Sequence, residues 1–187
     1  MLVSVALGSV VLAAVTTTYI TQSRFYGAQQ HVSEMRQNAR GAIDLLTREI
    51  KLAGYDPAGT AITTSNGIPY SALQLQILAD LNGDGDTADA DEAVVYSYDS
   101  ANKRILRATG GASNSLADNI SAFGFSYRDS TGVETSTTAA IRQIELNVTA
   151  QTSNPDPNTT GNGGYQTYQL TSVVTPQNLC YKAGSCP

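Results

Sequence analysis

The sequence has little of several residue types on which enzymes commonly depend. Its 187 residues include no tryptophan, two cysteines and one histidine, and only 14% of them are charged. The histidine, His31, follows two glutamines in a stretch that reads as helix, where a solvated or packing role is the ordinary one. The sequence also has no Gly-x-Ser-x-Gly elbow, no cysteine–histidine pairing and no phosphate-binding glycine loop. We therefore expect no catalytic residues and a protein that is not an enzyme.

Positive charge is also scarce. Eleven Lys and Arg residues stand against sixteen Asp and Glu residues, which gives a net charge of -5, and the basic residues form no patch of five or more. A nucleic-acid-binding surface needs a concentrated basic patch. We therefore predict no nucleic-acid partner, and we find no motif that predicts a small-molecule substrate.

Proline is absent from residues 1–53, which read as one long helix with two different halves. Residues 1–23 carry no ionisable side chain, and the run MLVSVALGSVVLAAV at 1–15 is largely apolar. At 1.5 Å per residue the uncharged half is about 34 Å long, so we expect it to lie in lipid or in protein and to be long enough to span a membrane. Its candidate assembly residues are the large apolar ones: Leu2, Val3, Val5, Leu7, Val10, Val11, Leu12 and Val15.

Two other interpretations of this N-terminal half stay open. The Leu-Ala-Ala triplet at 12–14 resembles a signal-peptide cleavage site, although the first basic residue is Arg24 and a basic n-region is therefore missing. An ordinary single-span anchor is the second alternative.

Residues 24–54 form the amphipathic half of the same helix. Its apolar residues recur at steps of three and four, with charged residues on the other side. This apolar stripe consists of Val32, Met35, Ala39, Ala42, Ile43, Leu46, Ile50 and Ala53. A stripe of this kind requires a domain to cover it. Gly54 stands where a left-handed C-cap would lie and Pro57 follows, so we expect the helix to end there.

Residues 55–187 read as a C-terminal β-rich globular domain that begins with a connecting loop. Alternating apolar and polar residues predict strands at 73–77, 93–98, 104–107, 120–128, 141–148 and 165–174. Leu73, Leu75 and Ile77 should share one face toward the helix, and the aromatic side of 120–128 should be buried. Residues 109–115 and 152–164 read as loops because they are rich in Gly, Ser, Asn and Thr. The predicted fold class is α+β, a long helix packed on an antiparallel β-sheet domain.

The two cysteines, Cys180 and Cys186, lie six residues apart at the C-terminus with Gly184 between them. A zinc site would need further ligands nearby, and the sequence offers none there. The spacing therefore predicts a small disulfide loop and an oxidising compartment.

An acidic loop at 80–91 has the spacing of a twelve-residue calcium loop, with oxygen-bearing side chains at positions 1, 3 and 5 and glycine at position 6. The expected metal ligands are Asp80, Asn82, Asp84, the Asp86 carbonyl and Asp91. Position 12 is aspartate rather than glutamate, Glu92 comes one residue late, and strands are expected on either side. Weak calcium binding and a solvated acidic turn therefore both remain open.

Three stretches together resemble one known family. They are the apolar start with the helix end LLTREIKLAGYDPAG, the segment LADLNGDGDTADADEAVVYSYDSANKRILR, and LADNISAFGFSYRDSTG. This combination resembles type IV prepilins, in particular PilW-like minor pilins and the related minor pseudopilins of type II secretion. In that family a basic leader, a glycine and a mature start ending in glutamate precede the helix, and the printed sequence aligns from the residue after that glutamate. We expect the upstream reading frame to encode these elements.

The resemblance implies a type IV pilin-like fold and a non-catalytic structural subunit that acts in fibre assembly or priming. It implies other pilin or pseudopilin subunits as partners through the N-terminal helix. It also implies a place in the bacterial inner membrane with a periplasmic domain, then in a filament at the cell surface or in the periplasm. The alternative function is a singly anchored, calcium-stabilised extracytoplasmic binding domain that does not polymerise.

Overall fold

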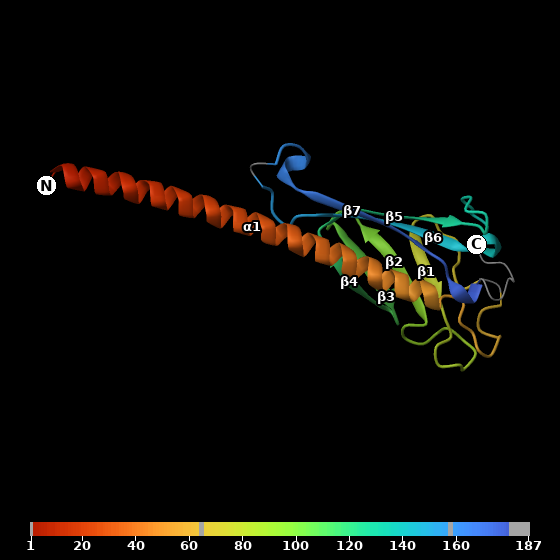
Figure 1. Cartoon of the computed structure of the whole chain (residues 1–187). Coiled ribbons are helices and arrows are strands. Elements are labelled where there is room, and N and C mark those ends of the chain that lie inside the picture. The colour runs from red at the N-terminus through yellow and green to blue at the C-terminus, as the bar shows by residue number, and fades with distance from the viewer. Residues whose placement is uncertain (1, 64–65, 157–158, 180–187) are drawn as a thin grey trace.

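The computed structural model describes residues 2–63, 66–156 and 159–179, without the side chains of residues 2, 5, 6 and 10. The first element, α1 (Leu2–Leu52), is one helix of 51 residues, as the sequence predicts. At 1.5 Å per residue it is about 76 Å long. Figure 1 shows its N-terminal part extending away from the β-domain, while its C-terminal part lies against the strands.

The end of α1 is fixed by glycine and by a distant side chain. Gly54 has φ +77°, the left-handed conformation expected of a C-cap. Its N–H donates to the Leu78 carbonyl oxygen at 2.9 Å. The amide of Asn178 donates to the carbonyl oxygens of Leu52 and Ala53, both at 3.3 Å. The last turn of the helix is therefore tied to a strand and to the C-terminal part of the described chain.

The strands form two antiparallel sheets. The first has the order β1-β2-β3-β4, and the second has the order β5-β6-β7. Their bounds are β1 Gln74–Leu78, β2 Ala93–Asp99, β3 Arg104–Thr109, β4 Ala112–Asp118, β5 Ile120–Arg128, β6 Gln143–Gln151 and β7 Thr167–Val174. Two short 3-10 helices, η1 (Thr138–Ala140) and η2 (Asn162–Gly164), lie in the connections. The predicted α+β fold class, with a long helix on antiparallel strands, is confirmed.

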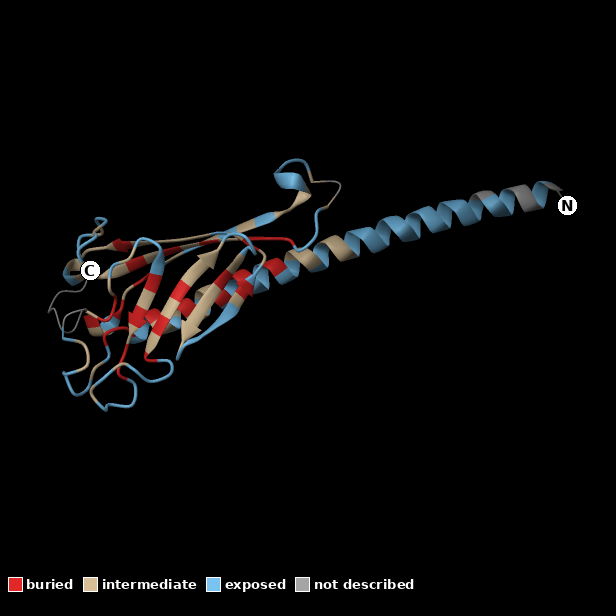
Figure 2. Ribbon diagram, turned by 180° about the vertical axis from the view of Figure 1, so that it is seen from behind, coloured by how far each residue is buried: buried red, intermediate tan, exposed pale blue. Residues whose placement is uncertain are grey.

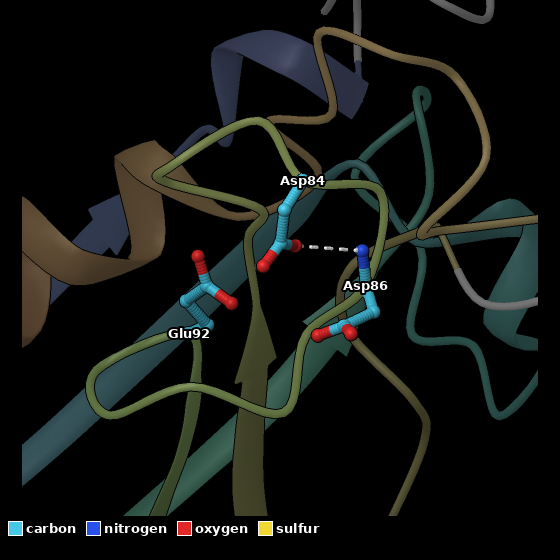
Figure 3. Close-up of side chains that lie close together, drawn as sticks. All are labelled: Asp84, Asp86 and Glu92. Atoms are coloured by element: carbon cyan, nitrogen blue, oxygen red, sulfur yellow. Dashed lines mark hydrogen bonds between the residues drawn. The ribbon is translucent and has the colours of Figure 1, made fainter.

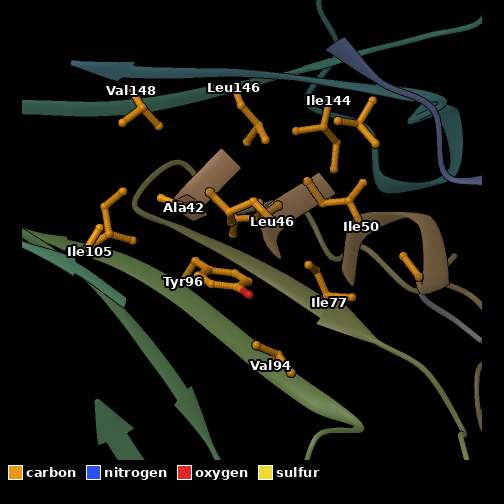
Figure 4. Close-up of a cluster of buried hydrophobic side chains, with 14 of the residues drawn as sticks. Ala42, Leu46, Ile50, Ile77, Val94, Tyr96, Ile105, Ile144, Leu146 and Val148 are labelled. Atoms are coloured by element: carbon orange, nitrogen blue, oxygen red, sulfur yellow. The ribbon is translucent and has the colours of Figure 1, made fainter. Parts of the chain in front are cut away.

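One hydrophobic core joins the helix to both sheets. Figure 4 shows the helix side chains Leu46 and Ile50 between Leu146 of β6 on one side and Tyr96 of β2 on the other. The stripe predicted for residues 32–53 is buried as expected, with Val32 and Ile43 only partly buried. The buried positions of the stripe are Met35, Ala39, Ala42, Leu46 and Ile50 in α1 and Ala53 directly after it. The amphipathic half of α1 thus belongs to the folded domain.

Three differences from the sequence prediction concern the strands. Residues 109–115 are not a loop, because Ala112–Asp118 forms β4, which pairs with β3 through a Gly110–Gly111 turn. Leu73 is 87% exposed, since it precedes β1, whereas Leu75 and Ile77 are buried as expected. The alternation of residues predicted that Ile120 lies on the face of β5 opposite to the buried aromatic residues. A bulge between Ile120 and Ala122 instead places Ile120 in the core.

Among the described residues, no helix is long and apolar enough to cross a membrane. This finding differs from the span expected for residues 1–23. The run is uncharged over that length, but the four threonines at positions 16, 17, 18 and 21 follow the apolar part, which ends at Val15.

Candidate functional sites

The N-terminal part of α1, residues 2–26, is an exposed arm. Each of its described side chains from Val3 to Tyr26 is exposed, as the pale blue ribbon of Figure 2 shows. At 1.5 Å per residue the arm is about 37 Å long. Its large exposed apolar side chains are Val3, Leu7, Val11, Leu12, Val15, Tyr19, Ile20, Phe25 and Tyr26. Of the assembly residues predicted from the sequence, the side chains of Leu2, Val5 and Val10 lie outside the described residues.

Hydroxyl groups of the arm are bonded within the helix itself. Four threonines each donate to the carbonyl oxygen four residues earlier, at 2.7 to 2.9 Å. They are Thr16, Thr17, Thr18 and Thr21. This back-bonding satisfies the hydroxyl protons without water or another chain. The arm therefore carries neither charge nor an unpaired threonine donor before Arg24, and it suits apolar surroundings.

Just beyond the arm, His31 of α1 contacts the β-domain. Its Nδ1 lies 3.0 Å from the Ser153 hydroxyl and its Nε2 lies 3.3 Å from the Asn154 amide. Glu34, one turn along the helix, lies 3.6 Å from Nδ1. These contacts give the only histidine a structural role, which fixes the connection after β6 to the helix.

A second connection between helix and sheet lies near the acidic loop. Glu49 of α1 accepts hydrogen bonds from Arg107 Nη2 at 2.8 Å and from the Tyr96 hydroxyl. Burial, followed by the bond to Glu49, raises the pKa of Tyr96, so the phenol stays protonated. Arg107 Nη2 also donates to Asp91 Oδ1 at 2.8 Å. Asp91, a predicted metal ligand, is thus engaged with an arginine.

The acidic loop between β1 and β2 is organised around two buried carboxylates. Asp80 is fully buried, and its two oxygens accept backbone N–H bonds from Gly83 at 2.6 Å and Gly85 at 3.0 Å. Glu92 is 2% exposed, and its Oε1 accepts the N–H groups of Leu81 at 2.9 Å and Asn82 at 3.2 Å. The side chains at the two ends of the loop, Asp80 and Glu92, therefore both bind backbone N–H groups of the loop.

Three carboxylates of the loop come together. Potential ligand oxygens of Asp84, Asp86 and Glu92 lie within 4.8 Å of one another. Figure 3 shows the three carboxylate groups around a common space, with the Asp86 N–H donating to Asp84. The structure therefore brings Asp84 and Asp86 of the predicted set together with Glu92. Asp80 and Asn82 instead bond within the loop, since the Asn82 amide donates to Asp84 and to Asp89.

The predicted disulfide cysteines, Cys180 and Cys186, lie outside the described residues. Their pairing stays a prediction from the sequence.

Comparison with known proteins yields a single kind of match. No protein-family model matches the chain, and no curated protein does. Among solved structures, the chain is similar to a type IV-like pilin from Thermus thermophilus, at 15% sequence identity and a TM-score of 0.49. The match covers 77% of this chain and 97% of that one.

Proposed function

We propose that this protein is a non-catalytic, type IV pilin-like structural subunit of a filament. Within that class we propose a PilW-like minor pilin or pseudopilin that acts in fibre assembly or priming. The observation that carries the proposal is the exposed arm, which is uncharged up to Arg24 and apolar up to Val15, yet covered by no described part of the chain. The resemblance of its sequence to prepilin helices supports the arms of other pilin-type subunits as the occupant of that surface.

In the isolated chain, the apolar side chains of the arm are mostly exposed, so the free energy that their burial could contribute is not gained. Five aliphatic residues among the described side chains of the arm are each 61 to 73% exposed: Val3, Leu7, Val11, Leu12 and Val15. Complete burial of such a side chain contributes about 1.5 to 3 kcal/mol. Several burials of this size would offset the entropy lost when a subunit joins an assembly. Association of the arm with other apolar helices is thus favourable.

The attachment of the domain to α1 leaves the arm free for such packing. Only the part of the helix from about Val32 onward supports the core, and Figure 1 shows the arm clear of both sheets. A bundle of arms could therefore form the centre of a filament with the β-domains outside. Such a filament would lie at the cell surface or in the periplasm.

A charge placed in the arm should test this function. Leu12→Arg, in a tagged full-length chain made in cells that assemble the filament, should prevent incorporation into sheared filaments, because the guanidinium would be buried without a partner. Leu73→Arg is the matched control, since Leu73 is 87% exposed on the β-domain. Incorporation of the Leu12→Arg chain at the control's level would refute the role of the arm. An unchanged amount of folded protein in cells would show that the defect lies in assembly.

A further inference from the structure

Glu92 holds a carboxylate oxygen that has no partner within the described chain. The residue is 2% exposed, its Oε1 accepts two backbone N–H bonds, and its Oε2 is buried without a hydrogen bond. A buried, unpaired carboxylate oxygen is costly, since it has lost water and gained no compensating contact. Something positively charged or protic is required beside it.

The charged groups closest to the Glu92 carboxylate are themselves carboxylates, so they do not supply the positive partner that it requires. Asp84 and Asp86 bring their carboxylates within 4.8 Å of that of Glu92. Among the described ion pairs, the nearby arginine Arg107 is held by Glu49 and Asp91, and no lysine or arginine pairs with these three carboxylates. Mutual repulsion between them therefore adds to the cost of the buried oxygen.

We propose that Asp84, Asp86 and Glu92 form a calcium site that closes the acidic loop. Two oxygens bound to one Ca²⁺ at about 2.4 Å can be at most about 4.8 Å apart, and the three carboxylates satisfy this limit. The donor set contains only oxygen, which favours a hard cation over zinc or copper. Exposed Asp84 and Asp86 leave room for water ligands, while buried Glu92 supplies the fixed side of the site.

This ligand set differs from the one predicted by spacing, because two of the predicted ligands, Asp80 and Asp91, have other partners. Asp80 shapes the loop through the N–H groups of Gly83 and Gly85, and Asp91 binds Arg107. The acidic loop joins β1 to β2 and lies near the C-terminal end of α1, away from the arm (Figure 1), so the site can be tested without filament assembly.

Calcium titration of the full-length chain in mild detergent, after removal of metal with a chelator, tests the proposal. Calorimetry should give a Kd of about 0.1 to 1 mM for CaCl₂, with weaker binding of MgCl₂. At 10 mM, calcium should raise Tm by about 3 to 10 °C. No heat of binding and no Tm rise at 10 mM calcium would overturn the proposal.

Three variants separate this site from a general acidic surface. Glu92→Gln and Asp86→Asn should each weaken calcium binding at least about tenfold. Asp86 is exposed, so Asp86→Asn remains informative if the change at buried Glu92 prevents folding. Asp89→Asn is the matched control, since Asp89 lies in the same loop and bonds to Asn82 outside the cluster. Its Kd should stay within about twofold. Equal effects of Asp86→Asn and Asp89→Asn would show diffuse attraction rather than a site.

Discussion

Truncating Leu46 to alanine should destabilise the protein far more than the same change at Leu12. Both leucines lie on α1, so the difference in helix propensity is the same. Leu46 is fully buried between the two sheets, whereas Leu12 is 68% exposed on the arm. Leu→Ala at a buried site costs about 2 to 5 kcal/mol, and a surface change usually costs less than about 0.5 kcal/mol. For a chain of this size, each kcal/mol lowers Tm by about 2 to 4 °C.

Thermal unfolding followed by circular dichroism, with the chain in mild detergent, measures this difference. We expect Tm to fall by about 4 to 20 °C for Leu46→Ala and by no more than about 2 °C for Leu12→Ala. In the filament-incorporation assay, Leu12→Ala should cause the larger loss, because it removes apolar surface that only the assembly buries. Equal losses of Tm, or a larger loss at Leu12, would refute the division of α1 into a core segment and a free arm.

Three further predictions follow from the remaining features. Deleting residues 1–23 should give a folded monomer with an unchanged β signal, and aggregation or loss of that signal in light scattering and circular dichroism would contradict the account of the arm. Cys180 and Cys186 should appear as one intramolecular disulfide in the mass of unreduced protein, whereas two alkylatable thiols in periplasm-derived material would exclude it. The Asn102 side chain, with Arg104, lowers the pKa of Asp99 to about 2 from an ordinary 3.8, so the unfolded chain binds the proton first. Stability should therefore fall as pH drops from about 4 to 2, and Asp99→Asn should flatten that fall relative to the unchanged chain in acid unfolding curves.

The long helix could be predicted because its signals are local. Apolar steps of three and four from Val32 to Ala53 define the buried stripe, and Gly54 defines the end. The buried positions Leu46 and Ile50 both come from that stripe. Sequence alone could not show that Asn178 caps the same helix end, because that contact joins residues more than 120 positions apart.

The arrangement of strands was harder to predict. Alternation tells which residues share a face, but it does not tell which strands are neighbours, so it left the division into two sheets undetermined. The sequence did not predict β4, because its first four residues, Ala112 to Ser115, are all exposed. Its pairing with β3 depends on backbone hydrogen bonds. Apolar periodicity, the main sequence signal of a strand, is therefore weak there.

The acidic loop shows how far a spacing pattern can identify a site. The pattern located the loop and placed glycine at position 6, where Gly85 adopts φ +93°. Counting twelve residues from Asp80 assigned position 12 to Asp91, with Glu92 one residue late. In this chain the loop runs into β2, and Glu92, the residue before that strand, is buried against the loop backbone instead.

Site-specific photo-crosslinking of the arm in assembled filaments tests the central claim most directly. A photoreactive phenylalanine at position 12, with the same residue at exposed position 73 as the control, would report what covers each site. We predict that position 12 crosslinks to the N-terminal helices of other pilin-type subunits, identified by mass spectrometry, and that position 73 does not. A chain absent from filaments, or a position 12 that captures no other subunit there, would contradict the account.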